Sequence, residues 1–181
     1  MITDSFVERL KQLEGFKDKP YFDTVGKVTI GYGRNLEANP LTTNEVRALM
    51  NRVKWNSRKD AEDWAEMLMK KDLARISEEL ENKLGIWPMC SKSEQIVLLD
   101  MAYNVGVPSL LNFKGMLDAI DNDNLTLAAY ECLNSKYATT VKTRAIANAK
   151  MLAETEGNFE AAMEMLQNNQ PSIFEVLAEH T

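Results

Sequence analysis

The stretch that decides the fold of this chain is residues 14–33, which read EGFKDKPYFDTVGKVTIGYG. The residues before it are apolar at spacings of three and four, which predicts a short amphipathic helix. We expect this helix to open at Asp4 or Ser5, both of which are favourable N-cap residues. It should end at Glu14, because Gly15 is a typical C-terminal stop. Glu14 is therefore predicted at the carboxyl end of a helix.

The second half of the stretch predicts a β-hairpin. Residues 21–23 and 27–30 alternate like two short strands, and residues 24–26 join them with a glycine. Successive side chains of a strand point to opposite faces. With this register, the hairpin brings Asp23 and Thr29 close together.

A carboxyl group at a helix end and another on a facing hairpin indicate acid and base catalysis. The negative end of the helix dipole disfavours the ionised form of Glu14, whereas hydroxyl groups and turn amides near Asp23 favour its ionised form. Two carboxyl groups in unlike surroundings are what a glycosidase needs. The residue types alone leave a second interpretation open, in which both acids are solvated on an ordinary surface hairpin.

The spacing of the motif is more specific than its composition. The motif consists of Glu14-Gly15, Tyr21, Asp23, Gly26, Thr29-Ile30-Gly31 and Gly33. It resembles the catalytic signature of bacteriophage lysozymes (endolysins) of the T-even type, glycoside hydrolase family 24. The resemblance covers roughly residues 5–155 and is sharpest up to Gly33. The next residue, Arg34, departs from the histidine that many family members carry there.

The resemblance implies a role for each residue of a catalytic trio. Glu14 would be the general acid, and Asp23 with Thr29 would position the attacking water. The implied reaction is inverting hydrolysis of the β-1,4 bond between N-acetylmuramic acid and N-acetylglucosamine in peptidoglycan, without a metal or another cofactor. Arg144 would pair with Glu14 and support it. The implied sugar-binding residues are Asn35, Tyr103, Asn104, Phe113 and Glu131.

The resemblance also implies an α+β, mostly helical, lysozyme-like fold in one domain. The small lobe with the hairpin would comprise residues 14–60, and a connecting helix would comprise residues 61–84. Residues 1–13 and 85–155 would form the larger helical lobe. Residues 156–181 would add an acidic helical extension, and the sequence leaves open whether it binds a membrane, a partner or its own lobe.

Several local patterns predict individual helices. Thr42 or Thr43 should open a helix, and the Ser91-x-x-Glu94 pattern is a capping box for another. The apolar stripe of residues 140–154 predicts a single helix.

Composition excludes several classes of function. The single histidine, His180, rules out Ser-His and Cys-His nucleophiles and histidine-rich metal sites. Cys90 and Cys132 show no paired spacing, so free thiols in a reducing compartment are expected. The net charge is −6, and residues 151–181 contain six glutamates without lysine or arginine. The remaining body is neutral, so nucleic-acid binding is not expected.

The sequence also predicts where such an enzyme acts. No apolar run is long enough to span a membrane, and the first residues are polar and acidic rather than a secretory signal. We therefore expect synthesis in the host cytoplasm and action on the periplasmic cell wall after release. Release would need a separate holin-type pore, and the chain is expected to be a monomer.

Three other functions remain open from the sequence. The first is a catalytically silent lysozyme-like module that binds or inhibits at peptidoglycan. The second is an all-helical interaction protein that recruits a partner through its acidic tail. The third is a glycanase such as a chitosanase, which keeps the carboxyl pair and cleaves a different polymer.

Overall fold

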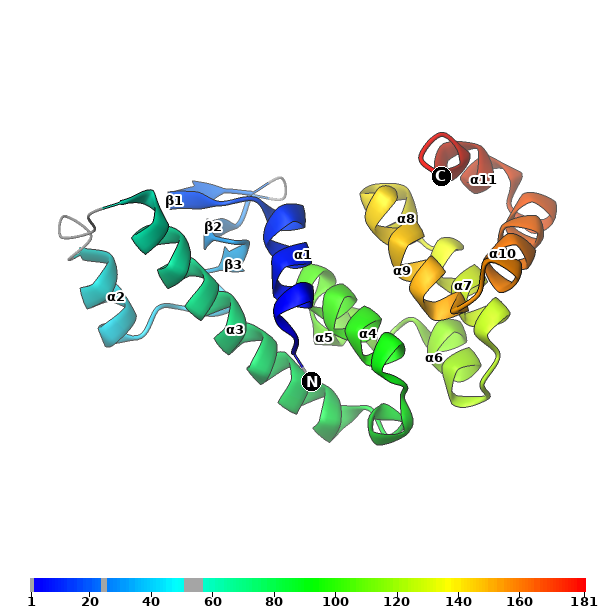
Figure 1. Ribbon diagram of the computed structural model, residues 1–181, viewed down its shortest axis with the longest axis horizontal. Coiled ribbons are helices and arrows are strands. Elements are labelled where there is room, and N and C mark those ends of the chain that lie inside the picture. Colours follow the sequence, from blue (N-terminus) through cyan, green and yellow to red (C-terminus); the bar gives the residue numbers. More distant parts are fainter. Residues whose placement is uncertain (1, 24–25, 51–56) are drawn as a thin grey trace. The chain divides into compact units, whose positions relative to one another are not determined.

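The computed structural model describes residues 2–23, 26–50 and 57–181, which form two compact units (Figure 1). We call Ile2–Arg75 the sheet unit and Ile76–Thr181 the helical unit, and the division falls within helix α3 (Arg58–Lys83). The family resemblance groups residues 1–13 with the later helices, whereas α1 (Asp4–Glu14) clusters here with the sheet. The many helices and the small sheet confirm an α+β, mostly helical fold.

Helix α1 begins and ends through local backbone interactions. Thr3 is its N-cap, because the Thr3 hydroxyl accepts a hydrogen bond from the Phe6 N–H at 3.3 Å. The prediction of Asp4 or Ser5 as the cap was wrong, since both residues already lie within the helix while Thr3 is extended. Gly15 ends the helix as predicted, with a φ of +66° that suits glycine.

Within the described part of the chain, the sheet has three antiparallel strands in the order β1 (Lys17–Phe22), β2 (Val28–Gly31) and β3 (Arg34–Asn35). The pairing of β1 with β2 confirms the predicted hairpin, although Thr24 and Val25 of its turn lie outside the described residues. Strand β1 includes Pro20, which has no backbone N–H to donate. An edge strand tolerates proline because one of its sides has no partner strand to bond. Strand β3 was not predicted, since two residues are too few to show an alternation.

Helix α2 (Thr43–Met50) completes the sheet unit before α3. The Thr42 hydroxyl accepts the Glu45 N–H at 3.3 Å, and the Glu45 carboxylate accepts the Thr42 N–H at 2.9 Å. This reciprocal pair is a capping box. It identifies Thr42 as the cap among the two predicted threonines.

The helical unit contains a short 3-10 helix followed by eight α-helices over the described residues that follow α3. They are η2 (Trp87–Met89), α4 (Lys92–Val105), α5 (Val107–Leu110), α6 (Lys114–Asp121), α7 (Leu125–Leu133), α8 (Lys136–Val141), α9 (Thr143–Ala153), α10 (Glu156–Asn169) and α11 (Pro171–Ala178). The predicted capping box of α4 is confirmed, with Ser91 and Glu94 bonding each other's backbone N–H groups.

The single helix predicted over residues 140–154 was wrong. The chain breaks at Lys142, whose φ of +37° separates α8 from α9. Just before the break, the hydroxyls of Thr139 and Thr140 both donate to the Lys136 carbonyl oxygen. Such side-chain bonds compete with the regular backbone pattern of a helix.

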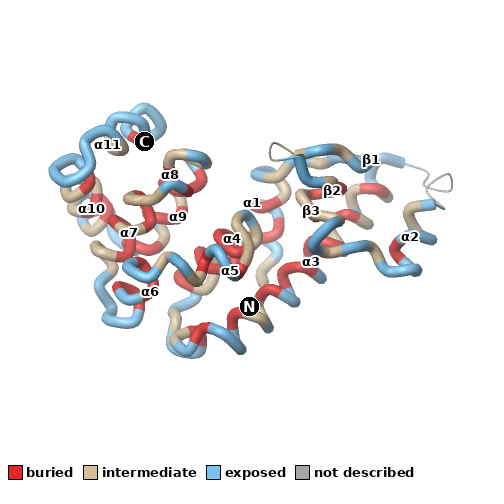
Figure 2. Tube along the Cα trace, turned by 180° about the vertical axis from the view of Figure 1, so that it is seen from behind, coloured by how far each residue is buried: buried red, intermediate tan, exposed pale blue. Residues whose placement is uncertain are grey.

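The core of the helical unit forms around α7, which contacts α6, α9 and α10. Buried positions lie along α7 and α9 (Figure 2), and the residues at these positions are small or apolar, which lets the helices pack closely. These residues include Ala128, Ala129, Cys132, Leu133, Ala145, Ala149 and Leu152.

The acidic extension packs against its own unit. Phe159, Leu166 and Leu177 are buried, and the Lys150 ammonium lies 4.9 Å from the centre of the Phe159 ring. Helix α10 contacts α7 and α9, and α11 contacts α8. Apolar burial therefore holds residues 156–181 on the helical unit. Among the described helices, none combines the length and the hydropathy needed to span a membrane.

Candidate active site

Glu14, the last residue of α1, lies with its carboxyl group against Gly33. A Cβ atom at position 33 would lie 2.8 Å from the Glu14 Oε2 atom, and Gly33 also has a φ of +81°. A side chain at this position would therefore displace the Glu14 carboxyl group and strain the backbone. The glycine after the second strand of the motif thus makes room for the predicted general acid.

Asp23 and Thr29 meet at the backbone of Lys27. The Asp23 Oδ1 atom accepts the Lys27 N–H at 2.8 Å, and the Thr29 hydroxyl donates to the Lys27 carbonyl oxygen at 3.1 Å. Thr29 is only 3% exposed. The hairpin therefore brings the two side chains to one residue, as the register predicted. Because the Thr29 hydroxyl donates its hydrogen to Lys27, its oxygen retains the capacity to accept a hydrogen bond from water.

Tyr21 lies opposite Thr29 in the pairing of β1 with β2. Burial raises the pKa of Tyr21, and the negative charges of Glu14 and Asp23 raise it further. The phenol is thus electrostatically coupled to both predicted catalytic carboxyl groups. Sequence reasoning assigned Tyr21 no role, although its place two residues before Asp23 in the motif was a usable signal.

Asn35, predicted to bind sugar, shapes the loop after β3. Its Oδ1 atom accepts the N–H groups of Glu37 at 2.9 Å and Ala38 at 3.0 Å. Its backbone is paired with Thr29 across β2 and β3. Asn35 therefore stabilises the edge of the sheet next to Thr29, and its contact with sugar stays a prediction.

Arg34, which departs from the family's common histidine, still forms local ion pairs. Its guanidinium lies 3.5 Å from the Asp72 carboxylate and 3.6 Å from the Glu45 carboxylate. It also donates to the carbonyl oxygens of Asn39 at 3.1 Å and Pro40 at 3.2 Å. The arginine therefore ties the end of the sheet to α2, to α3 and to the loop between β3 and α2.

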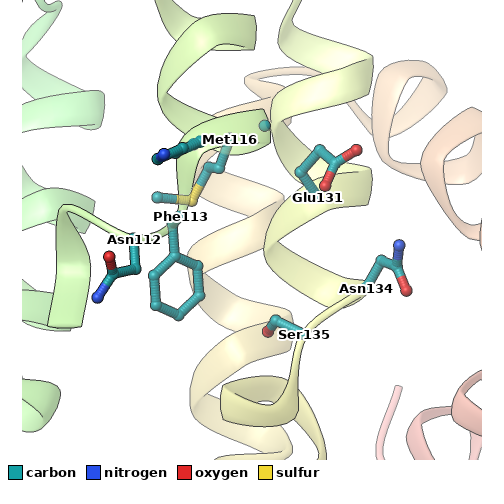
Figure 3. A pocket seen from close by; sticks show the side chains of 8 residues that line it. Asn112, Phe113, Met116, Glu131, Asn134 and Ser135 are labelled. Atoms are coloured by element: carbon teal, nitrogen blue, oxygen red, sulfur yellow. The ribbon is translucent and has the colours of Figure 1, made fainter.

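Phe113 and Glu131 line the same pocket of about 280 Å³ in the helical unit (Figure 3). The Glu131 carboxylate packs on Gly115, where an added Cβ atom would lie 2.8 Å away. The other lining residues are Asn112, Lys114, Gly115, Met116, Asn134 and Ser135. The structure thus brings these two predicted sugar-binding residues together in a pocket with an aromatic ring, charges and amides. Tyr103 and Asn104 lie in the last turn of α4, half-buried and exposed respectively, and their roles stay predictions.

Arg144, the predicted supporting residue, forms a buried ion pair with Asp100. Its Nε atom lies 3.1 Å from Asp100 Oδ2, and its Nη2 atom lies 3.2 Å from Asp100 Oδ1. Asn148 donates to Asp100 Oδ2 at 2.6 Å and to the Tyr137 hydroxyl at 3.1 Å. Sequence reasoning missed Asp100, although an aspartate within the apolar run 96–103 was a signal for a buried partner. The pairing of Arg144 with Glu14 stays a prediction.

Comparison with known proteins identifies the family. The family model described as phage lysozyme matches residues 11–151. The chain is 28% identical over 153 residues to the probable T4-type lysozyme 2 of Dictyostelium discoideum, covering 79% of this chain and 90% of that protein. It is 27% identical over 146 residues to the probable T4-type lysozyme 1 of the same organism, covering 75% and 86%.

A further relative is the pre-baseplate central spike protein Gp5 of Enterobacteria phage T4, which is 30% identical over 125 residues. The match covers 64% of this chain and 22% of the spike protein, so the chain spans about a fifth of that relative. The α+β fold and the carboxyl groups on the sheet unit fit a glycoside hydrolase of the lysozyme class. The chain belongs to the phage lysozyme family, and this assignment implies a peptidoglycan substrate.

Proposed function

We propose that this chain is a phage endolysin. It would act as a muramidase that hydrolyses the β-1,4 bond between N-acetylmuramic acid and N-acetylglucosamine in peptidoglycan. The observation that carries the proposal is the convergence of Asp23 and Thr29 on Lys27, within a unit where Tyr21 couples electrostatically to Asp23 and Glu14. Membership of the phage lysozyme family supports peptidoglycan as the polymer that is cleaved.

In this mechanism Glu14 donates its proton to the glycosidic oxygen. A water molecule held by Asp23 and Thr29 attacks the anomeric carbon from the opposite face of the sugar ring. The Asp23 carboxylate takes a proton from that water as the carbon–oxygen bond breaks. Attack from the opposite face inverts the anomeric configuration, and it requires room for one water between the two carboxyl groups.

The remaining residues would hold the polymer. The pocket supports a role for Phe113 and Glu131, whose ring and carboxylate offer stacking and hydrogen bonding to a sugar or to its peptide substituent. The proposed binding residues are Asn35, Tyr103, Asn104, Phe113 and Glu131, with Arg144 as the supporting residue of Glu14.

We also propose a place for this activity in the cell. The chain would be made in the host cytoplasm and would act as a monomer on the periplasmic wall. A separate holin-type pore would release it, and lysis of the host would follow. Clearing of intact host cells only when such a pore is co-expressed is the expected result, and clearing without it would contradict the release step.

The test of the enzymatic proposal is a turbidity assay on outer-membrane-permeabilised Gram-negative cells, combined with mass analysis of the muropeptides. We expect clearing by the wild type, with muramic acid at the new reducing ends. Glu14→Gln should lose about 10²–10⁴-fold in rate, because general acid catalysis contributes that much. Glu160→Gln, an exposed substitution on α10, should clear like the wild type.

Two outcomes would change the assignment. A Glu14→Gln variant with wild-type activity would contradict the proposed acid. A folded wild type that binds peptidoglycan without clearing cells would favour the catalytically silent binding module.

A further inference from the structure

Two short segments of the sheet unit meet beside the candidate active site. Residues 14–16 lead out of α1, and residues 31–33 lead out of β2. The rings of Phe16 and Tyr32 join the two segments, with their centroids 5.5 Å apart and their planes at 49°. An aromatic pair in such a tilted arrangement attracts beyond the area that it buries. The ring pair therefore links the chain after α1 directly to the chain after β2.

This link lies next to the contact of the proposed acid. Phe16 follows Glu14 by two residues, and Tyr32 directly precedes Gly33, against which the Glu14 carboxyl group lies. A glycine separates each ring from that contact or forms it, because Gly15 stands between Glu14 and Phe16. Glycine has the greatest backbone freedom of all residues, so the local sequence does not hold Glu14 against Gly33. The ring pair restrains both glycines from either side.

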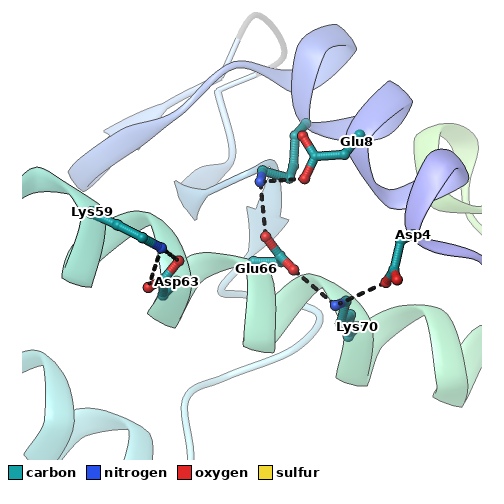
Figure 4. Close-up of polar contacts among 7 residues, drawn as sticks. Asp4, Glu8, Lys59, Asp63, Glu66 and Lys70 are labelled. Atoms are coloured by element: carbon teal, nitrogen blue, oxygen red, sulfur yellow. Dashed lines mark hydrogen bonds and ion pairs between the residues drawn. The ribbon is translucent and has the colours of Figure 1, made fainter.

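Tyr32 is the fixed member of the ring pair. It is only 6% exposed, and Gly31 before it packs on α3, where an added Cβ atom would lie 3.0 Å from the Cβ atom of Ala65. The Lys11 ammonium lies 5.7 Å from the centre of the Tyr32 ring. Lys11 also bonds Glu66 at 2.8 Å, in a network of ion pairs that joins α1 to α3 (Figure 4). Tyr32 is therefore held by both helices.

Phe16 is the member that connects Glu14 to this fixed ring. Its side chain is half-buried, and the Arg58 guanidinium lies 5.6 Å from the centre of its ring. The Arg58 side chain is 77% exposed, and a cation–π contact is weak at an exposed site. The contact of Phe16 with the buried Tyr32 ring is therefore its stronger restraint.

We propose that Phe16 is a positioning residue, whose ring packs on Tyr32 and thereby holds the Glu14 carboxyl group against Gly33. This role rests on the function proposed above. In that reaction the proton moves from Glu14 to the glycosidic oxygen, which keeps the electron pair of the breaking carbon–oxygen bond. Phe16 exchanges no proton or electron. It fixes where the proton donor stands, and a misplacement of about 1 Å can cost about 100-fold in rate.

The kinetic test removes the ring from Phe16 and, as a matched control, from Phe22. Phe22 belongs to the same hairpin arm and is 75% exposed. On soluble peptidoglycan fragments, Phe16→Ala should lower kcat by about 10–100-fold with KM unchanged, because only the chemical step depends on the position of Glu14. Phe22→Ala should keep the wild-type kcat and KM. Phe16→Tyr retains the ring and should restore kcat.

Circular dichroism separates this effect from a loss of folded protein. The assays are run at a temperature where each variant is fully folded. A folded Phe16→Ala with the wild-type kcat, or with a raised KM alone, would overturn the positioning role. If Phe16→Ala does not fold, Phe16→Leu takes its place, since it keeps most of the apolar volume. A folded Phe16→Leu with the wild-type kcat would overturn the role of the ring.

A second measurement does not depend on catalysis. Glu14→Gln should shift the NMR resonance of the Gly33 backbone amide, because the end of the Glu14 side chain lies against Gly33. The same substitution in a Phe16→Ala background should shift that resonance much less, because the side chain at position 14 is no longer held there. Equal shifts in the two backgrounds would overturn the positioning role. A reduced shift in a protein whose wild type clears no cells would support the positioning and contradict the hydrolytic function instead.

Discussion

Both units bury an arginine against carboxylates, but they do so in different ways. Arg34 of the sheet unit is 9% exposed and lies 3.5–3.6 Å from Asp72 and Glu45. Arg144 of the helical unit is 7% exposed and pairs in a bidentate manner with Asp100, which is fully buried. The shortest hydrogen bonds of Arg34 go to backbone carbonyl oxygens, whereas those of Arg144 go to a single carboxylate.

The difference lies in how the charge is shared. Glu45 also accepts a hydrogen bond from Lys71 at 2.9 Å, and the Lys71 side chain is 54% exposed. The Arg34 site therefore distributes charge over several groups, one of which reaches solvent. Asp100, by contrast, accepts hydrogen bonds from Arg144 and from the neutral amide of Asn148. A shared network should tolerate the loss of one member better than a compact pair in the core.

The largest expected effect follows from removing the charge of Asp100. Asp100→Asn leaves Arg144 buried beside a neutral amide, which should lower the free energy of unfolding by about 3–5 kcal/mol. Denaturant unfolding at neutral pH measures this change. Asp118→Asn, an exposed substitution on α6, should stay within about 0.5 kcal/mol of the wild type. A loss below about 1 kcal/mol for Asp100→Asn would mean that the compact pair contributes little.

A smaller effect is expected at the shared network. Arg34→Lys keeps the positive charge but loses the planar fork that serves two carbonyl oxygens and two carboxylates. The free energy of unfolding should fall by about 1–3 kcal/mol, because a hydrogen bond or two is lost while the charge remains. If Arg34→Lys destabilises the chain more than Asp100→Asn does, the ranking of the two sites is wrong.

The smallest expected effect is on how stability depends on pH, and it distinguishes the two carboxylates beside Arg34, Asp72 and Glu45. Burial raises the pKa of Asp72, with the charge of Arg34 opposing the rise. Burial also acts to raise the pKa of Glu45, but hydrogen bonds from Lys71 and Thr42 outweigh it and leave that pKa below its ordinary value. The two acids should therefore contribute to stability with opposite dependence on pH.

The signs follow from proton binding. Folded Asp72 binds its proton more tightly than the unfolded chain does, so its contribution falls as pH rises from about 3.9 through its raised pKa. Glu45 contributes above about 4.3, and that stability is lost as pH falls through its lowered pKa. As pH rises from acid to neutral, Asp72→Asn should become more stable relative to the wild type and Glu45→Gln less stable, each by about 1 kcal/mol or less in denaturant unfolding. If the two differences change in the same direction with pH, this account is wrong.

Much of the local structure was predictable because it depends on close neighbours. The stop at Gly15, the capping box of Ser91 with Glu94 and the hairpin of β1 with β2 each involve residues near one another in the chain. The break at Lys142 was not predictable from periodicity, since the apolar stripe continues across it. The hydroxyl bonds of Thr139 and Thr140 favour the break, and periodicity does not register them.

The sequence by itself determined the family motif, the helix end at Glu14 and the hairpin that joins Asp23 to Thr29. These features rest on backbone preferences and on contacts across a few residues. The tertiary structure decided that Gly33 makes room for the Glu14 carboxyl group, that Arg34 reaches Asp72 on α3 and that Arg144 pairs with Asp100, 44 residues away. A buried charge takes whatever opposite charge the packing of distant helices brings to it, and no local pattern in the chain specifies that partner.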